Sequence, residues 1–321
     1  MYLTKEEESI VEGEKGKSMQ KAMKILTTLG DIYDADRLIP VKSAQISGVS
    51  YKTVGEAGLR FIEDFSEDER AKVSVPTTLN PAGMDLSNWG KMKIDENFAD
   101  KQIRVIDAFK KMDVTLTCTC TPYLSGNLPK FGDHLAWAES SAVSFANSII
   151  GARTNREGGP SSLAASIIGK VPEYGLHLKG NRKATKIVKI NFEPSDMSEF
   201  SAIGIEVGDI VGDGIPYFKG LKLPSIDHGK ILGAAMAASG SVALYHVEEE
   251  TPEWENAVRD DLEVIEIERE DLEFRKDEDK PDLIYIGCPH ASLEEIREVS
   301  NLIENISSLN SDLWVSTSSG V

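Results

Sequence analysis

The stretch Cys118-Thr119-Cys120-Thr121-Pro122-Tyr123 opens a segment that closes with Gly151-Ala152-Arg153-Thr154-Asn155. Two thiols stand at its start, and a guanidinium and an amide stand at its end. The small residues of Ala136–Ile150 between them predict a buried helix. Thiolates are soft metal ligands, and arginine grips carboxylate or phosphate in a bidentate manner. The segment therefore indicates a metal site beside an anion-binding pocket.

Strands and helices alternate on both sides of this segment. The chain is predicted to form helices over Thr53–Ser66, Asp95–Met112 and Ser161–Ile168, and strands over Val114–Cys118, Ala184–Phe192 and Leu283–Ile286. Such alternation is typical of an α/β protein whose multi-layer α/β/α domains hold largely parallel sheets.

The acidic residues near the C-terminal end suggest where the domains divide. We expect a main α/β region with the substrate pocket at residues 1–250 and a solvated acidic connector at residues 251–280. Residues 281–321 would then begin a further α/β domain, expected to be incomplete.

Composition excludes several classes of protein. The net charge of −18 argues against binding to nucleic acid or to an anionic membrane surface. Residues 1–16 do not resemble a signal peptide, and no apolar run approaches the ~20 residues that a membrane span needs. Three cysteines make no disulfide framework and fit a reducing compartment. We expect a cytoplasmic protein.

The cysteines differ as candidate ligands. Cys118 and Cys120 are closer in sequence than zinc ligands usually are, so only one of them is expected to bind metal. Cys288 follows an apolar strand and precedes a helix predicted to begin near Ser292, where the helix dipole favours a thiolate. The alternative for each cysteine is a buried structural thiol.

Three polar groups complete the candidates. Arg153, Asn155 and Arg156 suit an anion pocket, although a helix end followed by a charged loop has the same composition. Asn80 lies on a loop after a strand, where α/β folds place functional groups, or where polar residues merely form a turn. His177 is expected on one face of a short extended piece with Lys179, and the alternative is a surface hairpin.

Taken together, several motifs resemble the aconitase X family. They are Ile46-Ser47-Gly48-Val49-Ser50-Tyr51, Thr77-Thr78-Leu79-Asn80-Pro81-Ala82-Gly83, Cys120-Thr121-Pro122-Tyr123, Glu139-Ser140-Ser141-Ala142-Val143, Gly151-Ala152-Arg153-Thr154-Asn155 and Gly175-Leu176-His177-Leu178. The resemblance implies an aconitase-like fold and an iron–sulfur cluster of the 4Fe–4S, 3Fe–4S or 2Fe–2S type, held by three cysteines.

The resemblance also assigns residues. Cys120 and Cys288 match cluster ligands, and the third is expected beyond Val321, so the chain is expected to be truncated. The implied substrate-binding residues are Ser47, Gly48, Val49, Ser50, Asn80, Pro81, Glu139, Ser140, Ser141, Arg153, Thr154, Asn155, Arg156 and His177. No catalytic base is assigned in this chain. The base is expected on a small swivelling partner subunit, which would make a heterodimer.

The implied reaction is loss of water from a phosphorylated hydroxy acid, (R)-5-phosphomevalonate, to give trans-anhydromevalonate 5-phosphate in a modified mevalonate pathway of isoprenoid synthesis. The first alternative is dehydration of cis-3-hydroxy-L-proline, the substrate of bacterial relatives. A second is a non-catalytic scaffold that binds a metabolite. A third is a zinc hydro-lyase that uses Cys120, Cys288 and His290.

Overall fold

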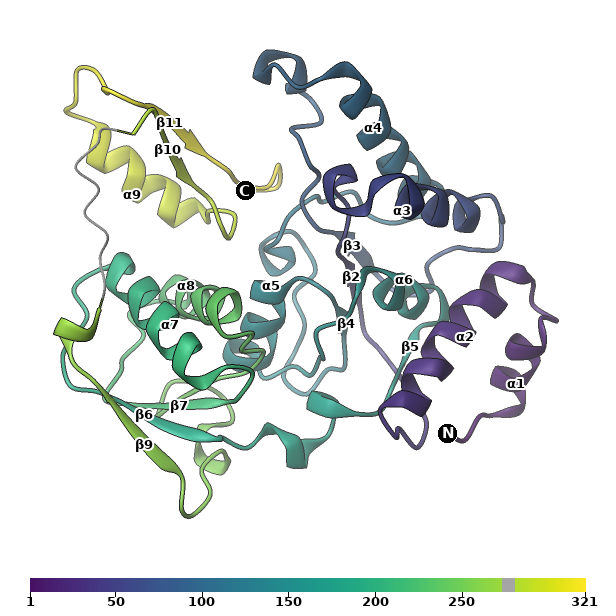
Figure 1. Ribbon diagram of the computed structural model, residues 1–321, viewed down its shortest axis with the longest axis horizontal. Coiled ribbons are helices and arrows are strands. Elements are labelled where there is room, and N and C mark those ends of the chain that lie inside the picture. Colours follow the sequence, from purple (N-terminus) through teal and green to yellow (C-terminus); the bar gives the residue numbers. More distant parts are fainter. Residues whose placement is uncertain (273–280) are drawn as a thin grey trace. The chain divides into compact units, whose positions relative to one another are not determined.

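A computed structural model describes residues 1–272 and 281–321 of the chain (Figure 1). The chain forms two compact units. Unit 1 comprises Met1–Pro122, Gly126–Glu139 and Ala152–Asn181, and unit 2 comprises Tyr123–Ser125, Ser140–Gly151 and Arg182–Val321. The expected boundary at residue 250 stays a prediction, and residues 273–280 of the expected connector lie outside the described residues.

Unit 1 is built around a parallel three-stranded sheet. Its strand order is β3-β2-β4, with β3 at Thr77–Leu79, β2 at Ala44–Ile46 and β4 at Ala136–Trp137. All three strands are buried, which is typical of parallel sheets covered by helices. The other elements of unit 1 are α1 (Lys5–Glu12), α2 (Lys17–Ile32), β1 (Leu38–Pro40), α3 (Tyr51–Ser66), α4 (Glu96–Lys111), α6 (Gly159–Ile168) and β5 (Lys170–Pro172), with single 3₁₀ turns at Trp89–Met92, Gly175–His177 and Lys179–Arg182.

The helices of unit 1 pack through apolar stripes. In α3 the buried residues Leu59, Ile62 and Phe65 recur at helical spacing. In α4, Val105 and Phe109 do the same. These side chains belong to one core cluster with the strands. The helices predicted at Thr53–Ser66 and Asp95–Met112 are confirmed, with bounds that agree within two residues at each end.

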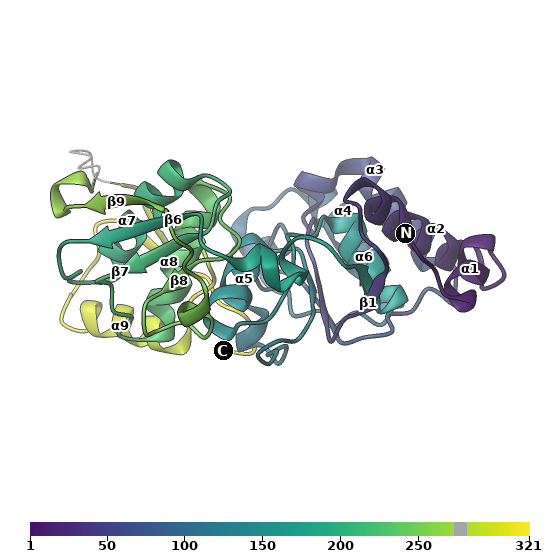
Figure 2. The same cartoon turned by 90° about the horizontal axis from the view of Figure 1, so that it is seen from below.

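Unit 2 holds a second parallel sheet with helices on one face, as both cartoon views show (Figures 1 and 2). The strand order is β8-β7-β6-β9. Helices α7 and α8 approach each other closely, since a methyl group on Gly204 would lie 2.7 Å from the Leu232 carbonyl oxygen. The elements are α5 (Ser140–Phe145) with a π-helical turn at Ala146–Ile150, β6 (Lys186–Ile190), α7 (Met197–Val211), β7 (Pro216–Lys219), α8 (Ile226–Ser239), β8 (His246–Val247), β9 (Glu263–Ile267), β10 (Leu283–Ile286), α9 (Leu293–Ile303) and β11 (Asp312–Val315), with 3₁₀ turns at Pro122–Leu124, Trp254–Asn256 and Arg269–Asp271.

The expected fold class, α/β with largely parallel sheets, is confirmed by these two sheets and by the parallel pair β10–β11. No helix of the described residues is long and apolar enough to cross a membrane.

Two predicted elements near the opening segment differ from the structure. The helix expected over Ala136–Ile150 begins only at Ser140, because Ala136 and Trp137 pair with β2 as strand β4. The strand expected over Val114–Cys118 is reduced to one isolated bridge between Thr115 and Thr78. Cys118 has a φ of +45°, a left-handed conformation that a regular strand does not contain.

Candidate active site at the carboxyl edge of a parallel sheet

Three of the predicted site segments meet where the strands of unit 1 end. Ser47 follows β2, Asn80 follows β3 and Glu139 follows β4. Asn80 Nδ2 donates a hydrogen bond to Glu139 Oε2 at 2.8 Å, and the Asn80 amide donates to the Ile46 carbonyl at 2.9 Å. The carboxyl edge of a parallel sheet is where open α/β folds bind ligands. The structure therefore brings residues of three distant motifs into one site.

The turn Ser47–Ser50 connects β2 to the first residue of α3. Gly48 has a φ of +71°, which the turn requires and which glycine adopts without strain. Gln102 of α4 fixes the turn, because its Nε2 donates to the Val49 carbonyl at 2.9 Å and its Oε1 accepts from the Tyr51 amide at 3.0 Å. Ser50 is the N-cap of α3, but its hydroxyl makes no capping bond. A kink at Gly55, where φ is +60° and ψ is −166°, separates this first turn from the rest of α3.

Two buried acceptors lie on this sheet edge and its central strand. Asn80 Oδ1 and Gln45 Oε1 have no hydrogen-bond partner among the described residues. Gln45 is fully buried in β2, and its Nε2 donates to the Thr119 carbonyl at 2.9 Å. A buried acceptor without a donor is costly, so each of these atoms would accept a hydrogen bond from a polar ligand or an ordered water.

The predicted anion-binding residues form a further parallel element beside β4. The Arg153 amide donates to the Asp133 carbonyl at 2.8 Å, and the Glu157 amide donates to the Trp137 carbonyl at 3.0 Å. The segment from residue 153 to residue 157 thus ends at the same carboxyl edge and leads into α6. A methyl group on Gly159 would lie 2.9 Å from the Ser47 carbonyl oxygen, so the first turn of α6 packs against the Ser47 turn.

Within this segment the side chains have different surroundings. Thr154 is fully buried, and its hydroxyl accepts from the Trp137 amide at 3.1 Å. Asn155 holds the neighbouring loop, with Oδ1 accepting from the Leu176 amide at 2.8 Å. Arg153 is half-buried, and its Nε has no hydrogen-bond partner among the described residues. Arg156 is exposed. Substrate binding by these four residues stays a prediction. Arg153 and Arg156 are the two that carry a cationic group.

His177 lies inside unit 1. Its side chain is buried, and its Nδ1 is 3.0 Å from the Nδ1 of His134. The prediction that His177 and Lys179 lie on a short extended piece is wrong, since two 3₁₀ turns occupy Gly175–His177 and Lys179–Arg182. The Arg153 Nη1 donates to the His177 carbonyl at 3.4 Å. A role for His177 in orienting substrate stays a prediction.

Glu157 is a candidate site residue that the sequence reasoning missed. Its side chain is buried, the Ser161 hydroxyl donates to its Oε2 at 2.6 Å, and its Oε1 has no hydrogen-bond partner among the described residues. Burial raises the pKa of this carboxyl from 4.5 to about 6, although the hydrogen bond from Ser161 lowers it. The sequence held one signal for this residue, its position directly before Gly158-Gly159-Pro160. Glycine and proline in this order predict a helix start that packs closely against neighbouring backbone.

Two of the predicted residues belong to the other unit. Ser140 and Ser141 open α5 of unit 2, whereas Glu139, the residue before them, belongs to unit 1. Ser141 is buried and Ser140 is half-buried. Their binding of substrate stays a prediction.

The cysteines also divide between the units. Cys120 of unit 1 is buried, and Cys288 of unit 2 is exposed on the loop between β10 and α9. Burial raises the pKa of the Cys118 thiol to about 11, which disfavours the thiolate that binds metal. No group of three His, Cys, Asp or Glu able to hold a metal occurs within the described residues. Thiols fit an iron–sulfur cluster in kind, and ligation of a cluster by Cys120 and Cys288 stays a prediction.

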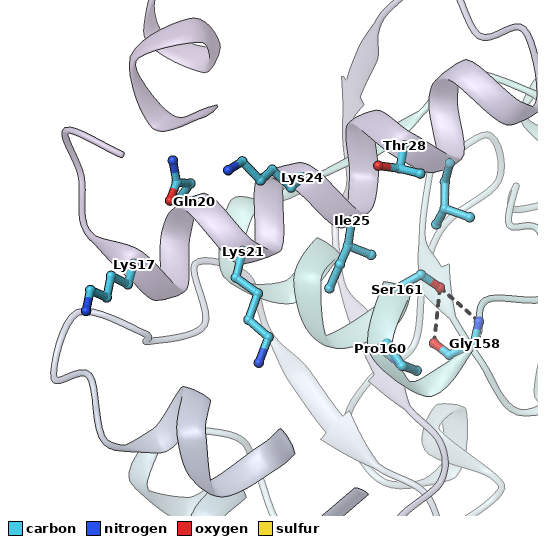
Figure 3. Close-up of a pocket in the computed structure, with 10 residues that line it drawn as sticks. Lys17, Gln20, Lys21, Lys24, Ile25, Thr28, Gly158, Pro160 and Ser161 are labelled. Atoms are coloured by element: carbon cyan, nitrogen blue, oxygen red, sulfur yellow. Dashed lines mark hydrogen bonds between the residues drawn. The ribbon is translucent and has the colours of Figure 1, made fainter. Parts of the chain in front are cut away.

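A cavity of about 700 Å³ lies elsewhere in unit 1, between α2 and the start of α6 (Figure 3). Lys17, Lys21 and Lys24 line its α2 side, and Pro160 and Ser161 line its α6 side. The ammonium group of Lys21 lies 4.3 Å from the centre of the Phe61 ring, a cation–π contact. None of the predicted substrate-binding residues lines this cavity, so it is not the expected site.

A parallel sheet with polar residues at the carboxyl ends of its strands defines an α/β protein with a candidate ligand site at a sheet edge. The chain belongs to the aconitase X family: residues 1–180 match the model of the aconitase X first domain, and residues 184–277 match that of the second domain.

Individual relatives agree with this assignment. The chain is 56% identical to the phosphomevalonate dehydratase large subunit of Methanocaldococcus jannaschii, over 98% of this chain and 81% of the relative. It is 32% identical to the cis-3-hydroxy-L-proline dehydratase of Hypocrea jecorina, over 94% of this chain and 53% of the relative. A crystal structure of Thermococcus kodakaraensis aconitase X in its holo-form matches with a TM-score of 0.93 and 55% identity, over 99% of this chain and 82% of that one.

Proposed function

We propose that this chain is the large subunit of a hydro-lyase that dehydrates (R)-5-phosphomevalonate to trans-anhydromevalonate 5-phosphate. The observation that carries the proposal is the identity of 49% to 57% with four archaeal proteins named phosphomevalonate dehydratase large subunit, each matched over at least 77% of its length. The geometry supports it, since Ser47, Asn80 and Glu139 meet at the carboxyl edge of a parallel sheet.

The substrate carries two anionic groups and one leaving hydroxyl, and the site offers groups of matching chemistry. The Ser47–Ser50 turn, at the N-terminus of α3, would bind one anion through backbone N–H groups. Arg153 and Arg156 would bind the other through their guanidinium groups. Asn80 would hold a hydroxyl of the substrate, because its buried Oδ1 lacks a donor among the described residues. Pro81 and Val49 would shape the wall of the site.

The cofactor of the proposal is an iron–sulfur cluster, with Cys120 and Cys288 as two of its ligands. When bound, it would supply a Lewis-acidic iron that favours departure of the hydroxyl as water. The relatives are named large subunits, so we expect a small subunit that completes the site and provides the base. A cytoplasmic location stays a prediction.

Reconstitution tests this function. The full chain and the small subunit are mixed anaerobically with iron and sulfide, and phosphomevalonate and cis-3-hydroxy-L-proline are assayed side by side. We expect loss of water from phosphomevalonate alone. Asn80→Ala should lower kcat/KM about 100-fold, because a site built to hold a hydroxyl loses both a contact and a specific geometry. Asn88→Ala is the matched control, since Asn88 is an exposed asparagine of the same unit.

The other outcomes contradict the proposal in different ways. Turnover of cis-3-hydroxy-L-proline but not phosphomevalonate would replace the substrate. Zinc without iron and sulfide in the active protein would replace the cofactor. Binding of phosphomevalonate without turnover, in the presence of the small subunit and a full cluster, would indicate a non-catalytic scaffold that binds the metabolite.

A further inference from the structure

A buried ion cluster lies within unit 2, outside the candidate site of unit 1. Its centre is Lys230 of α8, whose side chain is only 1% exposed. The Lys230 ammonium pairs with Asp227 Oδ1 at 3.1 Å and with Glu295 Oε2 of α9. Both carboxylates are themselves largely buried, with side-chain exposures of 12% and 13%. Three charges are therefore held together in the interior of unit 2.

The cluster holds the start of α9. Ser292, the N-cap of α9, donates from its hydroxyl to Asp227 Oδ2 at 2.8 Å. The Ser292 amide donates to Glu295 Oε2 at 2.7 Å, and the Glu295 amide donates back to the Ser292 hydroxyl at 3.2 Å, which completes a capping box. Each carboxylate bound by Lys230 thus also binds Ser292. The first turn of α9 is tied to α8 through one ammonium group.

The residues just before Ser292 form the loop that carries Cys288. The Ala291 amide donates to the Ser316 carbonyl at 2.9 Å, and the Thr317 hydroxyl donates to the Ala291 carbonyl at 2.8 Å. These bonds fix one end of the loop to the segment after β11, and the ion cluster fixes the same end to α8. The Cys288 thiol itself is exposed. An exposed thiol on a loop keeps one position only if the ends of the loop are held.

Stability alone does not explain this arrangement. Taking three charges out of water is costly, and an apolar trio of similar volume is often at least as stabilising. In some proteins buried ion pairs define one geometry, because charges tolerate few alternative arrangements. Here the geometry they define is the position of α9 against α8.

We propose that Lys230 is a positioning residue for Cys288: through Asp227, Glu295 and Ser292 it holds the loop of this thiol in the place required for binding the iron–sulfur cluster. This inference rests on the proposed function for the role of Cys288. It adds a residue of a different element, α8, that does not itself bind the cluster.

The experiment compares Lys230→Met, which keeps length and removes charge, with Lys230→Arg, which keeps charge. Lys222→Met is the matched control, because Lys222 of the same unit also pairs with two carboxylates, Glu249 and Glu250, but is 67% exposed. Each full chain is reconstituted anaerobically, and iron and sulfide per chain, hydrogen exchange of residues 287–296 and the unfolding temperature are measured.

In Lys230→Met we expect the affinity for the cluster to fall about tenfold, as for partners that orient metal ligands, and the iron and sulfide content after desalting to fall with it. Exchange at residues 287–296 should rise at the same time. Lys230→Arg should recover part of the cluster, and Lys222→Met should behave as the wild type. If Lys230→Met does not fold, Ser292→Ala replaces it, since that change removes the hydrogen bond to Asp227 and the capping bond from the Glu295 amide and leaves the ion pairs.

The inference is overturned if Lys230→Met, folded as the wild type, retains the wild-type content of iron and sulfide. A parallel loss in Lys222→Met would also overturn it, because the effect would then be one of general charge. A wild-type chain that binds no iron and sulfide with its small subunit would instead contradict the proposed function, and this inference with it.

Discussion

Replacing Glu157 by glutamine is expected to stabilise unit 1 at neutral and alkaline pH and to have little effect in acid. Glu157 is buried, and its pKa is raised from 4.5 to about 6 by burial. A carboxyl whose pKa is higher in the folded than in the unfolded state binds its proton more tightly when folded. The free energy of unfolding therefore falls as the pH rises from about 4.5 to above 6.

The magnitude follows from the two pKa values. A difference of about 1.5 corresponds to about 2 kcal/mol at 1.36 kcal/mol for each pKa unit. Glutamine does not titrate, so the stability of Glu157→Gln relative to the wild type should rise by about 2 kcal/mol between pH 4 and pH 8. Solvent screens this carboxyl little, because the residue is only 7% exposed.

The assay is urea unfolding followed by circular dichroism at half-unit steps of pH. Glu69→Gln controls for the removal of a charge, since Glu69 is an exposed glutamate of the same unit. The hydrogen bond from Ser161 to Oε2 lowers the pKa of Glu157. Ser161→Ala removes this bond, so it should raise that pKa further and enlarge the change in unfolding free energy with pH. A stability difference between Glu157→Gln and the wild type that does not change with pH would refute the reasoning.

Three further predictions concern packing and the site. Gly204→Ala should destabilise unit 2 by about 2 kcal/mol in urea unfolding, because its methyl group would overlap the Leu232 carbonyl on the facing helix; an unchanged midpoint would contradict the close approach of α7 and α8. Gly159→Ala should raise the KM for phosphomevalonate about tenfold, since its methyl group would press on the Ser47 carbonyl. Steady-state kinetics with the small subunit test this, and an unchanged KM would show that the Ser47 turn does not take part in substrate binding. Cys120→Ala should lose the visible absorbance of the reconstituted cluster, and a wild-type spectrum in this variant would exclude Cys120 as a ligand.

The opening segment shows how far local patterns reach. Helices α3 and α4 could be located from the sequence because an amphipathic stripe repeats every three to four residues within the element itself. The strand β4 could not, since Ala136 and Trp137 lie before small residues of helical character. They form a strand because they pair with Ala44 and Gln45, which lie about 90 positions earlier in the chain.

The candidate site divides in the same way. Ser47, Asn80 and Cys120 could be named from the sequence, through motifs that resemble one family. Other features followed only from the structure. Asn80 donates a hydrogen bond to Glu139, and the side chains of Thr154 and Asn155 accept hydrogen bonds from neighbouring backbone amides. Glu139 and Ser140 belong to different units. Hydrogen-bond partners are chosen by geometry between distant segments, which composition does not record.

By itself, the sequence of this protein determined the alternation of helices and strands, the family and the polar motifs that end the strands. The tertiary structure alone decided which titratable groups are buried. Glu157 and Lys230 lie in stretches that do not mark them as interior, yet one holds a raised pKa and the other centres a buried ion cluster. The reason is physical: desolvation depends on every group packed around a charge, and those groups come from parts of the chain far from it.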